Sequence, residues 1–102
     1  MAGPRVEKLH GFIAARPDDP FPRYALALEH RNAGEHDQAW RVFEELIARH
    51  PDYTSAYLHA GNALVALGRS EEARAIWRQG VEACAAKGDA HARSELEAAL
   101  AG

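Results

Sequence analysis

The sequence repeats itself with a period of 34 residues, and this regularity limits the possible folds more than any other feature. The aromatic Phe43 falls on the aromatic Trp77 at this offset. Identical residues also recur in the pairs Pro17 and Pro51, Asp18 and Asp52, Ile13 and Ile47, Gly34 and Gly68, and Ala39 and Ala73. A fixed period of this length is typical of proteins in which one supersecondary unit is stacked several times. We therefore expect a repeat array.

Signals for helix ends recur with the same period. Gly34 and Gly68 each follow an apolar helical pattern, where a left-handed C-terminal residue is favoured. Pro17 and Pro51 end the helices before them, because the residue preceding a proline is pushed out of the α region. Ser70 can cap the helix after Gly68. The connections are short, so neighbouring helices should be antiparallel. The predicted helices span about Pro4–Ala15, Phe21–Ala33, His36–Arg49, Ser55–Leu67, Ser70–Ala86 and Asp89–Ala101.

The composition agrees with an all-α fold, and the net charge indicates which classes of partner are not expected. Alanine supplies 22 of the 102 residues, whereas Val, Ile and Thr together supply only eight, which favours close-packed helices over strands. The 12 Lys and Arg against 15 Asp and Glu give a net charge of -3, so we expect neither nucleic acid nor an anionic membrane surface as a partner.

The cellular setting is predicted from what the sequence lacks. It has no apolar run of signal-peptide or membrane-spanning length, and its single cysteine, Cys84, cannot form an internal disulfide. These features predict a soluble protein in a reducing, cytoplasmic compartment.

The spacing within each period resembles the tetratricopeptide repeat. The second copy reads Tyr57-x2-Ala60-Gly61-x2-Leu64, followed by Gly68 and Ala73-x3-Trp77. The first copy is in register, but it has Arg23 and His30 in slots where the family favours aromatic residues. The resemblance covers essentially the whole chain and implies a right-handed α-α superhelix of a small bacterial-type protein. It divides residues 1–102 into an N-terminal half-repeat helix at 4–16, repeats at 20–53 and 54–87, and a capping helix at 88–102.

The resemblance also implies a binding surface. In this family the first helix of each pair forms the concave inner wall, which suits a peptide or a partner helix. Assigned with the 34-residue register, the predicted wall residues are Phe21, Tyr24, Leu28, Arg31, Ser55, Leu58, His59, Asn62, Val65 and Arg93. Some relatives bind a peptide carboxylate through lysines, arginines and asparagines on this wall. Here the wall has Asn62, Arg31 and Arg93 but no lysine, so we do not expect that mode.

The resemblance therefore predicts a protein-interaction scaffold or adaptor. Two alternatives remain open: a self-associating structural unit, as a homodimer that uses the wall itself, and an accessory subunit of an enzyme.

No enzyme activity or cofactor is predicted. The six histidines include no pair at i, i+3 or i, i+4 on one predicted helix, so we expect no metal site. No base is identifiable for Cys84, which we interpret as a packed thiol. The register places Trp77 in the core, whereas Trp40 is offset from the core stripe and is predicted to be partly exposed.

Overall fold

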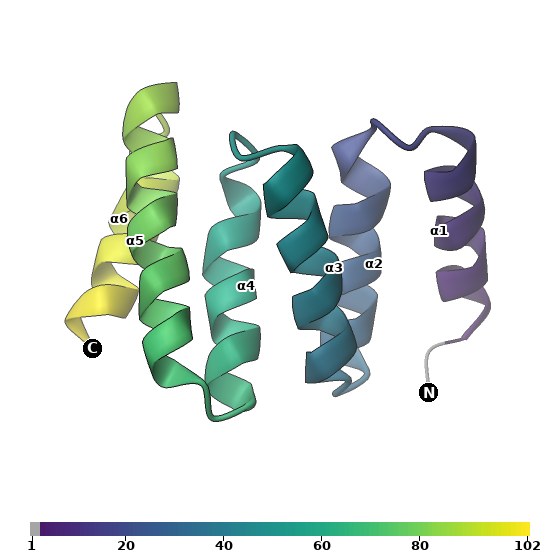
Figure 1. Cartoon of the computed structure of the whole chain (residues 1–102), viewed down its shortest axis with the longest axis horizontal. Helices are drawn as coiled ribbons and strands as arrows, with labels where there is room; N and C mark the ends of the chain where they lie inside the picture. Colours follow the sequence, from purple (N-terminus) through teal and green to yellow (C-terminus); the bar gives the residue numbers. More distant parts are fainter. Residues whose placement is uncertain (1–2) are drawn as a thin grey trace.

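The computed structural model describes residues 3–102, which form six α-helices joined by short connections (Figure 1). Each helix agrees with its predicted range to within one residue at either end, which confirms the repeat punctuation. The helices are α1 (Pro4–Ala15), α2 (Pro20–Asn32), α3 (His36–Arg49), α4 (Ser55–Ala66), α5 (Ser70–Lys87) and α6 (Ala90–Ala101).

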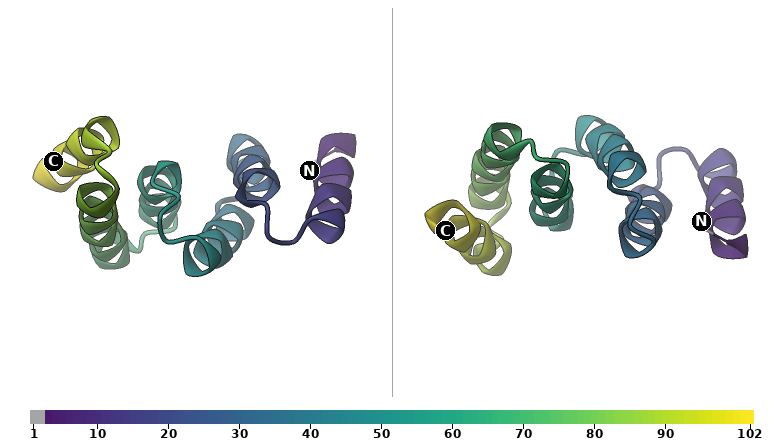
Figure 2. Two further views of the ribbon diagram at one scale, coloured as in Figure 1. Left: turned by 90° about the horizontal axis from the view of Figure 1, so that it is seen from above. Right: turned by 90° about the horizontal axis from the view of Figure 1, so that it is seen from below.

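The helices zigzag between two layers, as the end-on views show (Figure 2). Helices α2, α4 and α6 lie on one side, and α3 and α5 lie on the other. Each helix packs on the next along the chain, and α4 also contacts α6 directly. The result is an elongated all-α array with extents of 37 × 29 × 19 Å. We call the layer of α2, α4 and α6 the first layer. It contains the helices that carry the predicted wall residues.

Two glycines end α2 and α4 as predicted. Gly34 and Gly68 both have φ of +76°, a left-handed conformation that side chains disfavour. The predicted cap at Ser70 is wrong, because Ser70 is already the first helical residue and Arg69 holds the cap position. The Arg69 guanidinium reaches into the first turn and pairs with Glu72, with 2.6 Å between Nη2 and Oε2.

Both tryptophans are buried. The prediction for Trp77 is confirmed, whereas that for Trp40 is wrong, because each side chain is only 8% exposed. The face of α3 that carries Trp40 is covered by the next helix pair, so residues outside the stripe facing α2 are also buried. The Arg69 guanidinium lies over the Trp40 ring, 5.9 Å from its centroid.

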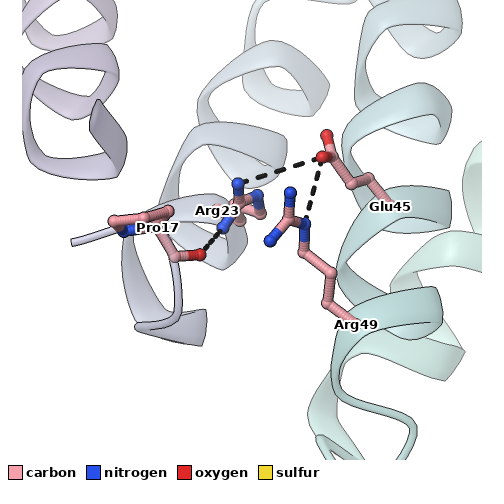
Figure 3. Close-up of polar contacts among 4 residues, drawn as sticks. All are labelled: Pro17, Arg23, Glu45 and Arg49. Carbon is pink, nitrogen blue, oxygen red and sulfur yellow. Dashed lines mark hydrogen bonds and ion pairs between the residues drawn. The ribbon is translucent and has the colours of Figure 1, made fainter. Parts of the chain in front are cut away.

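Arg23 stands where the repeat pattern favours an aromatic residue, and it makes the hydrogen bond that Tyr57 makes one repeat later. In α4, the Tyr57 hydroxyl donates to the Pro51 carbonyl at 2.5 Å. In α2, the buried Arg23 guanidinium donates to the Pro17 carbonyl, which lies 34 residues earlier than Pro51 (Figure 3). Its other terminal nitrogen lies 3.9 Å from Glu45 of α3. Arginine therefore anchors the α1–α2 connection as tyrosine anchors the α3–α4 connection.

Candidate functional site

The first-layer helices enclose a groove of about 230 Å³ between α4 and α6, which we call the α4/α6 groove. Leu58 of α4 supplies apolar surface, Leu96 of α6 lines the groove but is only 1% exposed, and Tyr24 contributes from α2. Three helices that are distant in sequence therefore contribute to one surface. The remaining lining residues are Thr54, Ser55, His59, Asp89, His91, Ala92 and Glu95.

A pair of hydrogen bonds fixes α6 against α4 at one end of this groove. Asp89 caps α6, and its Oδ1 accepts the Ala92 N–H at 3.1 Å. Its Oδ2 accepts the Thr54 hydroxyl proton at 2.5 Å, which ties the cap to the start of α4. The hydrogen bond from Thr54, followed by that from Ala92, lowers the pKa of Asp89 below its usual value. Asp89 is thus a charged structural anchor with both oxygens engaged.

An aromatic cluster forms the wall between α2 and α4. The Tyr24 ring lies 5.3 Å from that of Tyr53, 6.1 Å from that of His59 and 6.5 Å from that of Phe43. His59 in turn stacks on Phe43 with 6.3 Å between ring centroids. These separations are typical of favourable aromatic pairs, so the wall is held by packing on several sides.

His59 is held in its neutral form. Burial lowers the pKa of its imidazole, and the nearby Arg31 charge lowers that pKa further, while Glu95 acts in the opposite direction. The Arg31 Nη1 lies 2.9 Å from His59 Nδ1. Because the guanidinium can only donate, His59 accepts this bond through an unprotonated Nδ1. The contact links α2 to α4 at the margin of the groove.

The charged side chains on the α6 side make the groove acidic. Glu95 has a half-exposed carboxylate, and Asp89 is the second acid in the lining. His91 lies 3.8 Å from Glu95 and offsets its charge only when protonated. Among residues 3–102, no lysine or arginine lines the groove itself, and Arg31 lies at its margin against His59. A carboxylate would be repelled here, whereas a cation next to an apolar side chain would be accommodated.

The structure brings only part of the predicted wall into this groove, namely Tyr24, Ser55, Leu58 and His59. Arg31 joins at its margin through His59. Phe21 instead lines a separate recess against α1. The other predicted residues do not line the groove: Leu28 is half-buried, Asn62 and Val65 are exposed, and Arg93 is exposed and pairs with Glu97 at 3.3 Å.

Sequence reasoning missed Thr54, His91, Ala92 and Glu95. The signal for the α6 residues is their position beside Leu96, which is 1% exposed. Ala92 lies four residues before Leu96 and Glu95 lies one before it, so both flank its buried face. Thr54 carries no such signal, because its partner Asp89 is distant in sequence.

Comparison with known proteins assigns the architecture. The tetratricopeptide repeat model matches residues 31–101, more than half of the chain. The chain belongs to the tetratricopeptide repeat family. The sequence resemblance is thereby confirmed, as is the all-α helical repeat superhelix. Such repeats are typically non-catalytic scaffolds for protein interactions. No curated protein matches the sequence.

Solved structures of similar proteins support the assignment. The crystal structure of a tetratricopeptide repeat domain protein from Salinibacter ruber is 39% identical, with a TM-score of 0.76 over 80% of this chain and 91% of that chain. The solution structure of a protein from Bordetella parapertussis is 25% identical, with a TM-score of 0.80 over 98% of this chain and 86% of that one. The crystal structure of MamA protein is 27% identical, with a TM-score of 0.74 over 84% of this chain and 47% of that one.

Metal binding, thiol reactivity and membrane crossing were also considered for the described part of the chain. Residues 3–102 contain no group of three or more histidine, cysteine or acidic side chains placed to hold a metal ion. Cys84 is buried, and this burial raises the pKa of its thiol, which disfavours the reactive thiolate. No helix in this range is both long and apolar enough to cross a bilayer.

Proposed function

We propose that this tetratricopeptide repeat protein is a non-catalytic interaction module that binds a short peptide segment in the α4/α6 groove. The observation that carries the proposal is the pairing of the half-buried Leu58 with the Glu95 carboxylate in one groove. The proposal keeps the division of the chain into a half repeat, repeats at 20–53 and 54–87, and a capping helix.

The size of the groove favours an extended peptide over a helix. An α-helix with its side chains is about 10 Å across, which does not fit a space of about 230 Å³. Such a volume accommodates roughly one or two side chains. We therefore propose a ligand with an apolar residue that covers Leu58, next to a lysine or arginine that faces Glu95.

The affinity should be modest. Burying about 100 Å² of apolar surface contributes roughly 2.5 kcal/mol. Leu58 is already half-buried and Leu96 is fully buried, so the gain here is smaller, and the entropy of ordering the peptide opposes it. A groove with few anchors therefore fits a transient, exchangeable interaction. Specificity would come from charge, because the same acid that attracts a basic side chain repels an acidic one.

A pair of labelled peptides tests the proposal by fluorescence anisotropy. One carries a central Leu-Lys and the other a central Leu-Glu in the same surroundings. We expect the Leu-Lys peptide to bind more tightly, and Glu95→Gln to remove that preference. Leu58→Ala should weaken binding of the Leu-Lys peptide about tenfold, the effect of losing about 1.4 kcal/mol.

The matched control is Val65→Ala, an exposed apolar position on the same helix but outside the groove. Equal affinity of wild type, Leu58→Ala and Val65→Ala for the Leu-Lys peptide would contradict the site. Light scattering over a concentration series tests the homodimer alternative. A dimer that Leu58→Ala dissociates would mean that a second copy occupies this face.

A further inference from the structure

A larger apolar groove lies at the N-terminal end of the array, between α1 and α2, and has a volume of about 650 Å³. We call it the α1/α2 groove. Leu9 and Phe12 of α1 and Phe21 of α2 supply its apolar lining. Phe12 is 58% exposed and Phe21 is 62% exposed, the two most exposed large apolar side chains among residues 3–102. This surface is separate from the α4/α6 groove.

The next repeat shows what fills the equivalent space. At the 34-residue offset, Leu9 and Phe12 correspond to Phe43 and Leu46 of α3, and both of those side chains are fully buried. There the preceding first-layer helix, α2, packs on α3 and places Tyr24 against Phe43 at 6.5 Å. Among the described residues, no helix takes the corresponding place beside α1. The α1/α2 groove therefore corresponds to the space beside α3 that α2 fills one repeat later.

The rim of this groove is basic. Lys8 and Arg16 line it, and neither makes an ion pair with any described residue. Arg5 also lines it but is already paired with Glu29 at 2.6 Å. The one acidic lining residue is Asp19, which accepts the backbone N–H of Phe21 as the cap of α2. Two uncompensated cations beside exposed phenylalanines favour an apolar partner with acidic flanks.

A second copy of this chain does not match that chemistry. Two α1/α2 grooves face to face would bring Lys8 and Arg16 against like charges. At the opposite end of the array, α6 has no large apolar side chain as exposed as Phe12 or Phe21. There Leu96 is buried, and α6 presents exposed charged pairs such as Arg93 with Glu97.

We propose that the α1/α2 groove binds an amphipathic helix of a partner protein, which packs beside α1 as α2 packs beside α3. Its apolar stripe carries an aromatic residue in the position of Tyr24, beside Leu9, which corresponds to Phe43. Neighbouring apolar residues of the stripe cover Phe12 and Phe21. Acidic residues flank the stripe and face Lys8 and Arg16. This interaction does not depend on the peptide proposed for the α4/α6 groove.

The test uses two synthetic helical peptides of about 14 residues, about 21 Å long and thus comparable in length to α1. Both carry a leucine stripe with a central tyrosine. One has glutamate on both flanks of the stripe and the other has lysine. Binding of each labelled peptide to the full chain is measured by fluorescence anisotropy. We expect the glutamate peptide to bind at least tenfold more tightly than the lysine peptide, with a preference that declines as salt is added.

Variants assign the binding to this groove. Lys8→Glu and Arg16→Glu should each reduce affinity for the glutamate peptide several-fold. The matched control is Arg78→Glu, which makes the same charge change at an exposed position of α5 and should leave the affinity unchanged. Phe12→Ser should weaken binding of the glutamate peptide at least tenfold. Because Phe12 is exposed, circular dichroism should show that this variant remains folded. Leu58→Ala should leave this binding unchanged, which separates it from the proposed peptide site.

Three outcomes would overturn the proposal. The first is no binding of the glutamate peptide up to about 1 mM, a very weak affinity. The second is equal affinity for the two peptides. The third is a wild-type dimer in light scattering that Phe12→Ser dissociates, because the groove would then hold a second copy.

Discussion

Gly61→Ala should destabilise the protein although alanine is the better helix former. Gly61 lies within α4, directly beneath the indole of Trp77 on α5. A Cβ at this position would lie 2.0 Å from Trp77 Nε1 and 2.5 Å from its Cε2. Ordinary contact distances are about 3.5–4.0 Å, so the ring would have to move by about 1.5 Å. Trp77 is 8% exposed and packed in the core, which leaves no free space for that movement.

The expected cost follows from three contributions. Overpacking a core typically costs about 1–3 kcal/mol. Moving the indole also weakens the hydrogen bond from Trp77 Nε1 to the Leu58 carbonyl, now 3.3 Å long, and a bond of this kind contributes about 0.5–1.5 kcal/mol. Alanine in place of glycine returns about 1 kcal/mol of helix propensity. The net destabilisation is about 2 kcal/mol, which corresponds to a fall in Tm of about 8–16 °C for a domain of this size.

Thermal unfolding followed by circular dichroism measures this shift. The matched control is Gly11→Ala within α1, where a Cβ would meet nothing within 4 Å. That variant should keep or raise the Tm, by about 0.5–1 kcal/mol of added stability. If Gly61→Ala melted at or above the wild-type temperature, the close approach of α4 and α5 at this point would be refuted.

Three further perturbations test other parts of the fold. Arg23→Ala leaves the Pro17 carbonyl without its partner and should cost about 1–3 kcal/mol in urea denaturation. Arg23→Tyr, which introduces the side chain that Tyr57 supplies one repeat later, should recover most of that loss, and equal stability of the two variants would argue against the shared slot. Trp40→Ala should cost about 3–5 kcal/mol, and Trp40 fluorescence in a Trp77→Phe background should resist acrylamide quenching; strong quenching would restore the exposed assignment. The pKa of His59 is lowered from 6.5 on folding, so the unfolded state binds more protons just below that pH and stability should fall as the pH drops through this range. His59→Gln should reduce this pH dependence, and an unchanged profile from pH 7 to about 5 would contradict the assignment.

The helices could be predicted closely because their ends are set by local chemistry. Gly34 and Gly68 end helices through their own left-handed backbone, and Pro17 and Pro51 restrict the residue before them. None of these effects requires knowledge of the tertiary structure. A periodic pattern of such signals therefore fixes the number, length and order of the helices, and short connections fix their antiparallel arrangement.

The site was predicted less well because the period changes after α5. The second repeat has Ala85 where the preceding one has Pro51, so nothing stops the helix and α5 continues to Lys87. The buried face of α6 then follows α4 at an offset of 35, with Leu96 in the position of the buried Gly61. A strict offset of 34 aligns Arg93 with His59 and so places the exposed Arg93, which pairs with Glu97, in the predicted wall.

Burial of individual side chains was the other gap, because it depends on neighbours distant in sequence. Trp40 is offset from the stripe that faces α2, yet it is buried, because α4 of the next pair packs on α3 and Arg69 lies over the indole. Arg23 breaks the aromatic pattern, yet its guanidinium reaches a carbonyl that the periodic prolines place there. The repeat pattern predicts which positions contribute to the packing, but not which side chain fills each position or which contact it makes.

The two ends of the array differ in a way that this logic explains. A stacked array needs a polar outer face on its terminal units, and α6 provides one by burying Leu96 and exposing ion pairs such as Arg93 with Glu97. Helix α1 has only Leu9 buried and presents Phe12 to solvent, although its counterpart Leu46 is fully buried one repeat later. The same periodic sequence thus produces a covered surface on α3, where α2 packs from the preceding position, and an open one on α1. The exposed Phe12 is the surface that the helix proposed above would cover, and Lys8 and Arg16 beside it favour acidic residues on that helix.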